Sequence, residues 1–124
     1  MMKVPPASDA TKKSYDRIVE ILSTRGAQGS AMFGMPTAKV GGKGFLGLFG
    51  DAMVFKLTGK AHADALALKG AALFDPSGSG RAMKEWVVVP KTHAKKWDAL
   101  AEAALDYVIA TTEPKAKKKK ISRP

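Results

Sequence analysis

The first segment with a clear periodicity has the pattern of an amphipathic helix. Apolar residues recur there at the i, i+3, i+4 and i+7 spacing of one helix face: Tyr15, Ile18, Val19 and Leu22. Ser8 or Asp9 can cap the first turn, because a short polar side chain accepts a hydrogen bond from a main-chain N–H that the helix leaves free. Gly26 is suited to end the helix. The pattern predicts a helix that buries one face.

After this helix the pattern changes to short apolar runs separated by glycines, which is typical of strands. Gly41 and Gly42 lie between two such runs, residues 37–40 and 43–46. Two adjacent glycines can adopt the positive φ angles that a tight hairpin turn requires. The pair at residues 50–51 predicts a second turn of the same kind. Three strands joined in this way form an antiparallel meander.

The strand that follows the second turn alternates between two faces. Met53, Phe55 and Leu57 share one face, which we expect to be the core side. The other face is expected to be wetter, and its residues are Ala52, Val54, Lys56 and Thr58.

The second half of the chain alternates between helical and extended patterns. The expected elements are a short helix over residues 60–69 ended by Gly70, a brief strand over 72–74, a loop over 75–80 and a strand over 83–89 closed by Pro90. In the short helix, Leu66 and either Ala67 or Leu68 should point inward. Thr92 can cap the last helix, which Pro114 ends. The apolar stripe of that helix is the cleanest in the sequence: Trp97, Leu100, Ala101, Ala104, Leu105 and Val108.

The predicted order is helix, three strands, helix, two strands, helix. This order favours a small α+β fold in which helices pack on an antiparallel sheet of about five strands, with the core side of the third strand facing the last helix. We expect residues 1–7 to be a flexible N-terminus, residues 8–112 to be the folded domain and residues 113–124 to be a disordered polybasic tail.

Size and composition narrow the classes of function. A chain of 124 residues and 13.1 kDa has room for one domain, which excludes doubly wound nucleotide-binding folds and large barrels. The lack of cysteine excludes disulfide frameworks, thiolate metal sites and cysteine nucleophiles. No segment has the apolar run of a signal peptide or the roughly 18 apolar residues of a membrane span. A cytoplasmic location is therefore expected.

The net charge of +10 is unevenly distributed along the chain. The last ten residues contain no acid and six basic residues: Lys115, Lys117, Lys118, Lys119, Lys120 and Arg123. The first 114 residues hold the other 15 basic residues and all 11 acids, a net charge of +4. Such a run is either an arm that contacts nucleic acid or a solubilising end.

Motifs for cofactors and catalysis are weak in this sequence. Residues 42–47 match G-x-G-x-x-G, but they lie in strand-like sequence, and no helix opens at the last glycine as a dinucleotide site requires. No phosphate loop of the Walker type is present. His62 and His93 are far apart in the sequence, so we expect them to be solvated surface residues, and the acids are scattered. We therefore expect no cofactor, no metal and no enzymatic activity.

Two segments suggest binding rather than chemistry. Lys84 and Trp86 lie on the same face of their strand, and Arg81 precedes them. A cation beside an indole can stack on a base or on an aromatic ring of a partner, whereas the alternative is a core Trp86 with Lys84 at a solvated edge. The apolar residues 32–35 are either a core plug or a contact surface for a second copy.

A group of short motifs resembles the N-terminal domain of the TfoX/Sxy family. The motifs are Met32-Phe33-Gly34 after the opening helix, Gly42-Lys43 before an aromatic residue, Lys56-Leu57, Phe74-Asp75-Pro76, Gly80-Arg81-x-Met83-Lys84-x-Trp86 and Val89-Pro90. The resemblance extends from about residue 15 to residue 108. It implies an antiparallel sheet with helices packed on it and a bacterial cytoplasmic setting.

The better-known members of this family are bacterial regulators of natural competence, and they carry a second, helical C-terminal domain. This chain ends instead in the lysine-rich tail, and the resemblance supplies no catalytic residues. The expected function is a non-enzymatic regulatory or interaction module that binds a protein partner, such as the transcriptional machinery, or itself. The alternative is a direct nucleic-acid binder of low specificity that uses the tail and the region from Arg81 to Lys84.

Overall fold

The computed structural model describes residues 6–32, 35–75 and 83–112. The elements in chain order are helix α1 (Asp9–Leu22), the 3-10 turn η1 (Ser23–Arg25), strands β1 (Gln28–Met32), β2 (Met35–Val40), β3 (Lys43–Phe49) and β4 (Ala52–Lys56), helix α2 (Gly59–Leu66), strands β5 (Ala72–Phe74) and β6 (Met83–Pro90), the 3-10 segment η2 (Lys91–Lys96) and helix α3 (Trp97–Thr112). The class is α+β, as the sequence predicts.

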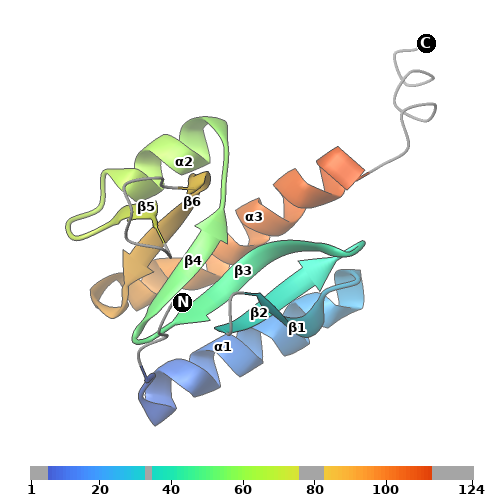
Figure 1. Cartoon of the computed structure of the whole chain (residues 1–124), viewed down its shortest axis with the longest axis horizontal. Coiled ribbons are helices and arrows are strands. Elements are labelled where there is room, and N and C mark those ends of the chain that lie inside the picture. Colours follow the sequence, from blue (N-terminus) through green and yellow to red (C-terminus); the bar gives the residue numbers. More distant parts are fainter. Residues whose placement is uncertain (1–5, 33–34, 76–82, 113–124) are drawn as a thin grey trace.

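The strands form one antiparallel sheet in the order β1-β2-β3-β4-β6-β5 (Figure 1). The first four strands are a meander, and β6 pairs with β4 before β5 closes the other edge. The structure has six strands where the sequence analysis expected about five. The additional strand is β1, whose sequence Gln-Gly-Ser-Ala-Met shows no alternation of large apolar and polar residues.

Helix α1 begins where its sequence predicts. The Ser8 hydroxyl accepts a hydrogen bond from the Thr11 N–H at 3.3 Å, which satisfies one of the free donors of the first turn. The helix ends at Leu22 and the turn η1 follows it; Gly26, with a left-handed φ of 99° that favours glycine, ends η1 rather than α1 itself. Tyr15, Ile18 and Leu22 are buried.

The main core lies between the sheet and the three helices of the described chain. Apart from Phe45, its strand members alternate along their strands, and its helix members come from every one of these helices: Tyr15, Ile18, Leu22, Ala27, Ala38, Phe45, Leu46, Leu48, Met53, Phe55, Leu57, Ala65, Val87, Val89, Trp97, Ala101, Ala104, Leu105 and Val108. Met53, Phe55 and Leu57 thus face the apolar stripe of α3, as expected. The indole N–H of Trp97 donates to the Val89 carbonyl at 3.2 Å and joins the start of α3 to β6.

A β-bulge lets two consecutive residues of β3 enter this core. Ala38 pairs with Leu46 and Lys39 pairs with Gly44, so Phe45 has no partner on β2. A bulge turns neighbouring side chains toward the same side of a sheet. Phe45 and Leu46 are both fully buried in the helix-side core.

The second face of β4 was expected to be wetter, and for Val54 this expectation is wrong. Val54 is fully buried there in a second cluster with Met35, Phe74 and Trp86. Phe49 packs edge-on against Phe74, with ring centroids 5.2 Å apart. The single-strand alternation could not show this, because the apolar partners of Val54 come from β2, β5 and β6.

Two further local expectations are wrong. Thr92 does not cap α3: residues 91–96 form the 3-10 segment, without a side-chain cap, and α3 begins at Trp97. The short helix α2 ends at Leu66, before the expected Lys69. The inward residues of this region are as expected, because Leu66 and Leu68 pack half-buried against the core and Ala67 is exposed; Ala65 is fully buried as well.

Several predicted features lie outside the described residues: most of the N-terminal segment 1–7, most of the loop at 75–80, Pro114 and the tail. Within the described ranges, none of the helices is both long and apolar enough to cross a membrane.

We predict that Leu105→Ala destabilises the fold by about 2 to 5 kcal/mol, because Leu105 is fully buried between α3 and the sheet and truncation leaves a cavity. Urea unfolding followed by circular dichroism measures the change. Ile21→Ala is the matched control, since Ile21 is 51% exposed on α1. Equal losses for the two variants would contradict the docking of α3.

Candidate interaction surfaces

The two binding residues expected on β6, Lys84 and Trp86, differ in their exposure to solvent. Lys84 is exposed, whereas Trp86 is only 6% exposed and packs with Met35, Val54 and Phe74. An indole that is buried in this way has no face to offer to a base. The structure therefore confirms the core interpretation of Trp86.

The structure does not describe the other candidate binding residues. Arg81 and the tail residues from Lys115 to Arg123 lie outside the described residues. Of the candidates, Lys84 is thus the one that the described structure places at the surface.

Glu85 connects α3 to the sheet and was not expected to do so. Its Oε2 atom accepts a hydrogen bond from the Tyr107 hydroxyl at 2.5 Å, and its Oε1 atom lies 3.9 Å from Lys56 Nζ. This hydrogen bond raises the pKa of Tyr107 above its ordinary value, because loss of the phenol proton would place a second negative charge beside the carboxylate. In the sequence Glu85 is one of the scattered acids, with no local pattern that indicates this contact.

Both histidines are half-buried rather than solvated. His62 Nε2 lies 2.7 Å from the Lys84 carbonyl oxygen and holds α2 against β6. His93 Nε2 lies 2.8 Å from the Lys69 carbonyl oxygen and holds η2 against the segment after α2. In each case the ring nitrogen donates, because a carbonyl oxygen can only accept. Within the described ranges, no group of three His, Cys, Asp or Glu side chains could hold a metal ion.

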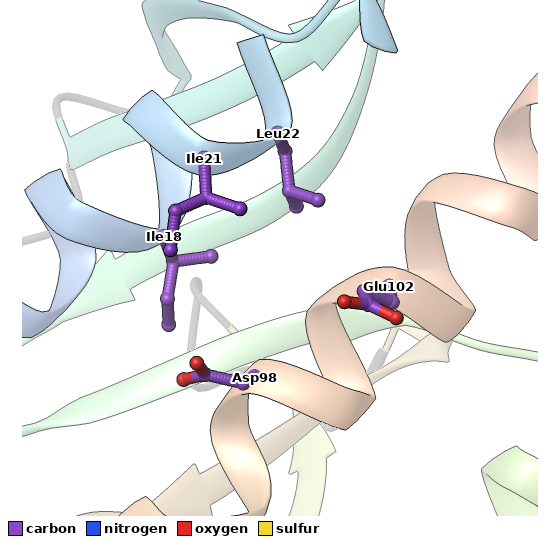
Figure 2. Close-up of a pocket in the computed structure, with 5 residues that line it drawn as sticks. All are labelled: Ile18, Ile21, Leu22, Asp98 and Glu102. Atoms are coloured by element: carbon purple, nitrogen blue, oxygen red, sulfur yellow. The ribbon is translucent and has the colours of Figure 1, made fainter. Parts of the chain in front are cut away.

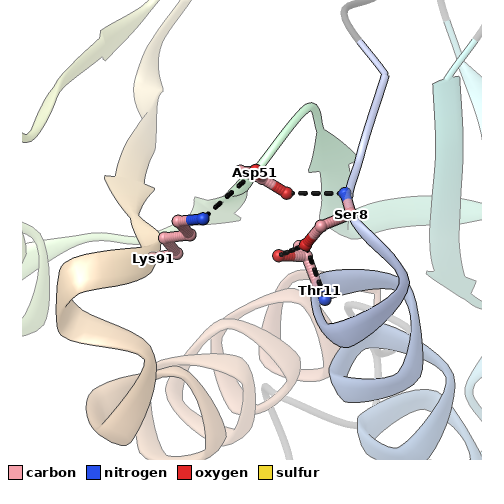
Figure 3. A network of polar contacts seen from close by, with 4 residues as sticks. All are labelled: Ser8, Thr11, Asp51 and Lys91. Carbon is pink, nitrogen blue, oxygen red and sulfur yellow. Dashed lines mark hydrogen bonds and ion pairs between the residues drawn. The ribbon is translucent and has the colours of Figure 1, made fainter.

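Asp51 is more than a turn residue, as Figure 3 shows. One carboxylate oxygen accepts a hydrogen bond from the Ser8 N–H at 2.7 Å, and the other lies 3.4 Å from Lys91 Nζ. The contact with Ser8 is the main cause that lowers the pKa of Asp51 to about 2. One side chain thus joins the β3–β4 turn to the start of α1 and to η2.

The interface between α1 and α3 carries a ladder of facing residues. Arg17 of α1 binds both carboxylate oxygens of Asp98 at 2.9 and 3.0 Å, and Arg25 of the following turn η1 pairs with Asp106. The two helices therefore run in the same direction. The Arg17 guanidinium also holds the pKa of Asp98 below its ordinary value.

A shallow hollow lies along this interface, and Figure 2 shows its lining. Ile18, Ile21 and Leu22 of α1 face Asp98 and Glu102 of α3 across it. Its cavity volume is about 10 Å³, room for about one water molecule and far below the range of about 300 to 1,000 Å³ typical of ligand pockets. The hollow thus offers little room for a small molecule.

The glycine-rich segment 42–47 belongs to the hairpin and the strand. Gly41 and Gly42 have φ angles of 58° and 81° in the β2–β3 turn, and the rest of the segment lies in β3. Another strand follows β3, so the strand, turn and helix of a dinucleotide site are not present here.

Strand β1 is a further surface that the sequence analysis missed. It forms one edge of the sheet, and Gln28, Gly29, Ser30 and Ala31 are all exposed. Its composition gave no strand signal, so no pattern in the sequence could reveal this edge.

Comparison with known proteins adds no relative. No protein-family model, no curated protein and no solved structure matches this chain. The resemblance to the TfoX/Sxy N-terminal domain therefore stays a prediction.

We predict that Asp51→Asn lowers the melting temperature above about pH 4 and loses this effect toward pH 2. A carboxyl whose folded pKa is about 2, below an unfolded value near 3.9, stabilises the fold above the unfolded pKa and loses that contribution as the pH falls through the folded one. Thermal melts from pH 6 to pH 2 measure the difference from the unsubstituted chain. Asp16→Asn, an exposed carboxylate within α1, is the control. A difference that does not change with pH would contradict the assignment.

Proposed function

We propose that this chain is a non-enzymatic interaction module of the TfoX/Sxy N-terminal-domain type that works in the bacterial cytoplasm. In this proposal the folded body binds a protein partner, such as a component of the transcriptional machinery, or a second copy of itself. The basic tail adds an attraction to nucleic acid.

The distribution of charge is the observation that carries the proposal. On the body, basic side chains are interleaved with acids, and five of them lie in ion pairs: Arg17, Arg25, Lys56, Lys60 and Lys91. The tail concentrates six basic residues without an acid. Phosphate contacts depend on concentrated positive charge, so the tail suits nucleic acid better than the body does.

The polar contacts within the folded body support the proposal that this chain is not an enzyme. Side chains that could act as acids or bases take part in contacts between elements: Asp51, His62, Glu85, His93 and Tyr107. Each of these contacts joins segments that are far apart in the sequence. They therefore have a structural role that needs no substrate.

Exposed Lys84 favours the second candidate function, direct binding of nucleic acid by the body. In that case Lys84 and Arg81 would contact phosphates together with the tail. The two candidates differ in what remains when the tail is removed.

We predict that a chain ending at Pro114 loses measurable binding to duplex DNA at physiological salt while it stays folded. For the full chain, the slope of log affinity against log salt should be roughly −5, because each of six neutralised phosphates contributes about −0.9. Fluorescence anisotropy over a salt series measures both quantities.

A matched pair of variants separates charge in the tail from charge on the body. Replacing Lys117, Lys118, Lys119 and Lys120 by Gln should make the slope shallower by about 3.6. Replacing Lys12, Lys13, Lys95 and Lys96 removes the same charge from exposed sites on the body and should have a smaller effect. Equal binding by the shortened and full chains would refute the role of the tail. Residual binding that Lys84→Ala reduces would favour the second candidate.

A further inference from the structure

Strand β1 buries less than any other strand of the described fold. Gln28, Gly29, Ser30 and Ala31 are exposed, and a Cβ added to Gly29 would meet no atom within 4 Å. Of the described strands, β2 alone pairs with β1. Ordering β1 costs conformational entropy, and hydrogen bonds to a neighbouring strand offset this cost along one side of the strand only.

This edge also lacks the features that normally prevent strand addition. Protected edges carry charged side chains, proline or a bulge, or they are very short. The described strand β1 has no charged residue and no proline, and its register with β2 is regular from Gln28 to Met32. The other edge, β5, has three residues and a register shift. Strand β1 is thus the open edge of the sheet.

The register indicates which main-chain groups point outward. Alternate residues of an antiparallel strand turn both N–H and C=O toward the same neighbour. Pro36 lies opposite Ala31 and has no N–H, so the bonds between β1 and β2 run through Ser30 and its partner Thr37. The N–H and C=O groups of Gly29 and Ala31 therefore face the free edge.

We propose that β1 pairs with β1 of a second copy of this chain, antiparallel about a two-fold axis at Ser30. Gly29 of each copy then lies opposite Ala31 of the other, and the two residues exchange both hydrogen bonds. The pairing makes about four main-chain hydrogen bonds between the copies and joins the two sheets. This inference rests on the proposed function and names the second copy as the partner of the body.

The charge of the chain limits which surfaces can join two copies. Two molecules that each carry a net charge of +10 repel one another, so a shared interface is best formed by uncharged residues. Strand β1 provides such a surface, and its small side chains permit close approach. The two Ser30 side chains meet on one face, where directly opposed Cβ atoms lie about 4.5 to 5.5 Å apart.

Pairing would also bring two basic tails into one assembly. Once one tail is on a nucleic acid, the second binds at a high effective concentration, which raises the overall affinity without any new contact. Self-association through β1 therefore strengthens the attraction that the tails provide.

Sedimentation velocity of the full chain over a concentration series tests the pairing. We expect a monomer and dimer in equilibrium, with the dimer lost in Ala31→Pro. That substitution removes an outward N–H and leaves the bonds between β1 and β2 in place. Ala31→Ser keeps the N–H and should keep the dimer. Circular dichroism checks that each variant is folded.

A charge exchange tests the register itself. Ala31→Lys should weaken the dimer, because each added ammonium group joins a contact between two basic molecules. Adding Gly29→Glu to Ala31→Lys should restore it, since position 29 of one copy lies opposite position 31 of the other. Gly29 is not among the glycines with positive φ, so the backbone accepts this side chain.

The outcomes separate this inference from the proposed function. A full chain that stays monomeric at every concentration, or a dimer that Ala31→Pro leaves intact, overturns the pairing. Either result would remove only the added affinity of two joined tails; DNA binding by a single tail is tested separately by the chain ending at Pro114. Loss of the dimer in Ala31→Pro together with rescue by the charge exchange supports the pairing and its register.

Discussion

The packing of α3 across the centre of the sheet is the contact on which the other elements depend. Ala101, Ala104, Leu105 and Val108 are fully buried against strand residues such as Met53. Ala101 and Ala104 of this helix are fully buried, and their small side chains leave room for the large side chains of the strands. Because this contact orders α3, the helix can in turn present Asp98 to α1, Asp106 to η1 and Tyr107 to Glu85.

The polar contacts contribute little to the stability of the fold, which comes mainly from the apolar core. Their role is to align the elements with one another. The pairs Arg17–Asp98 and Arg25–Asp106 are exposed, and exposed ion pairs contribute about 0 to 1 kcal/mol each. Their geometry nevertheless sets which turn of α1 lies beside which turn of α3. Asp51 has a similar role, because it joins three segments around the N-terminus of α1, where a negative charge is favourable.

Elements with a local signal could be predicted from the sequence, and those that depend on distant partners could not. The helix pattern around Ile18 and the glycine pair at residues 41–42 are local, and both are confirmed. The burial of Val54 depends on residues from three other strands, and β1 is a strand because β2 supplies its hydrogen bonds. The contacts of Asp51 and Glu85 reach 43 and 22 residues along the chain, beyond any local pattern.

Two surfaces of this molecule follow different physical rules. The tail acts through charge, so its attraction to nucleic acid weakens as salt rises and depends little on geometry. The β1 edge offers uncharged main-chain groups in a definite register, so a contact there depends on geometry and is less sensitive to salt. Salt also screens the repulsion between two basic chains, and pairing through β1 is therefore expected to strengthen as binding through the tail weakens. A measurement of both processes over one salt series would show opposite trends if the two surfaces act as we propose.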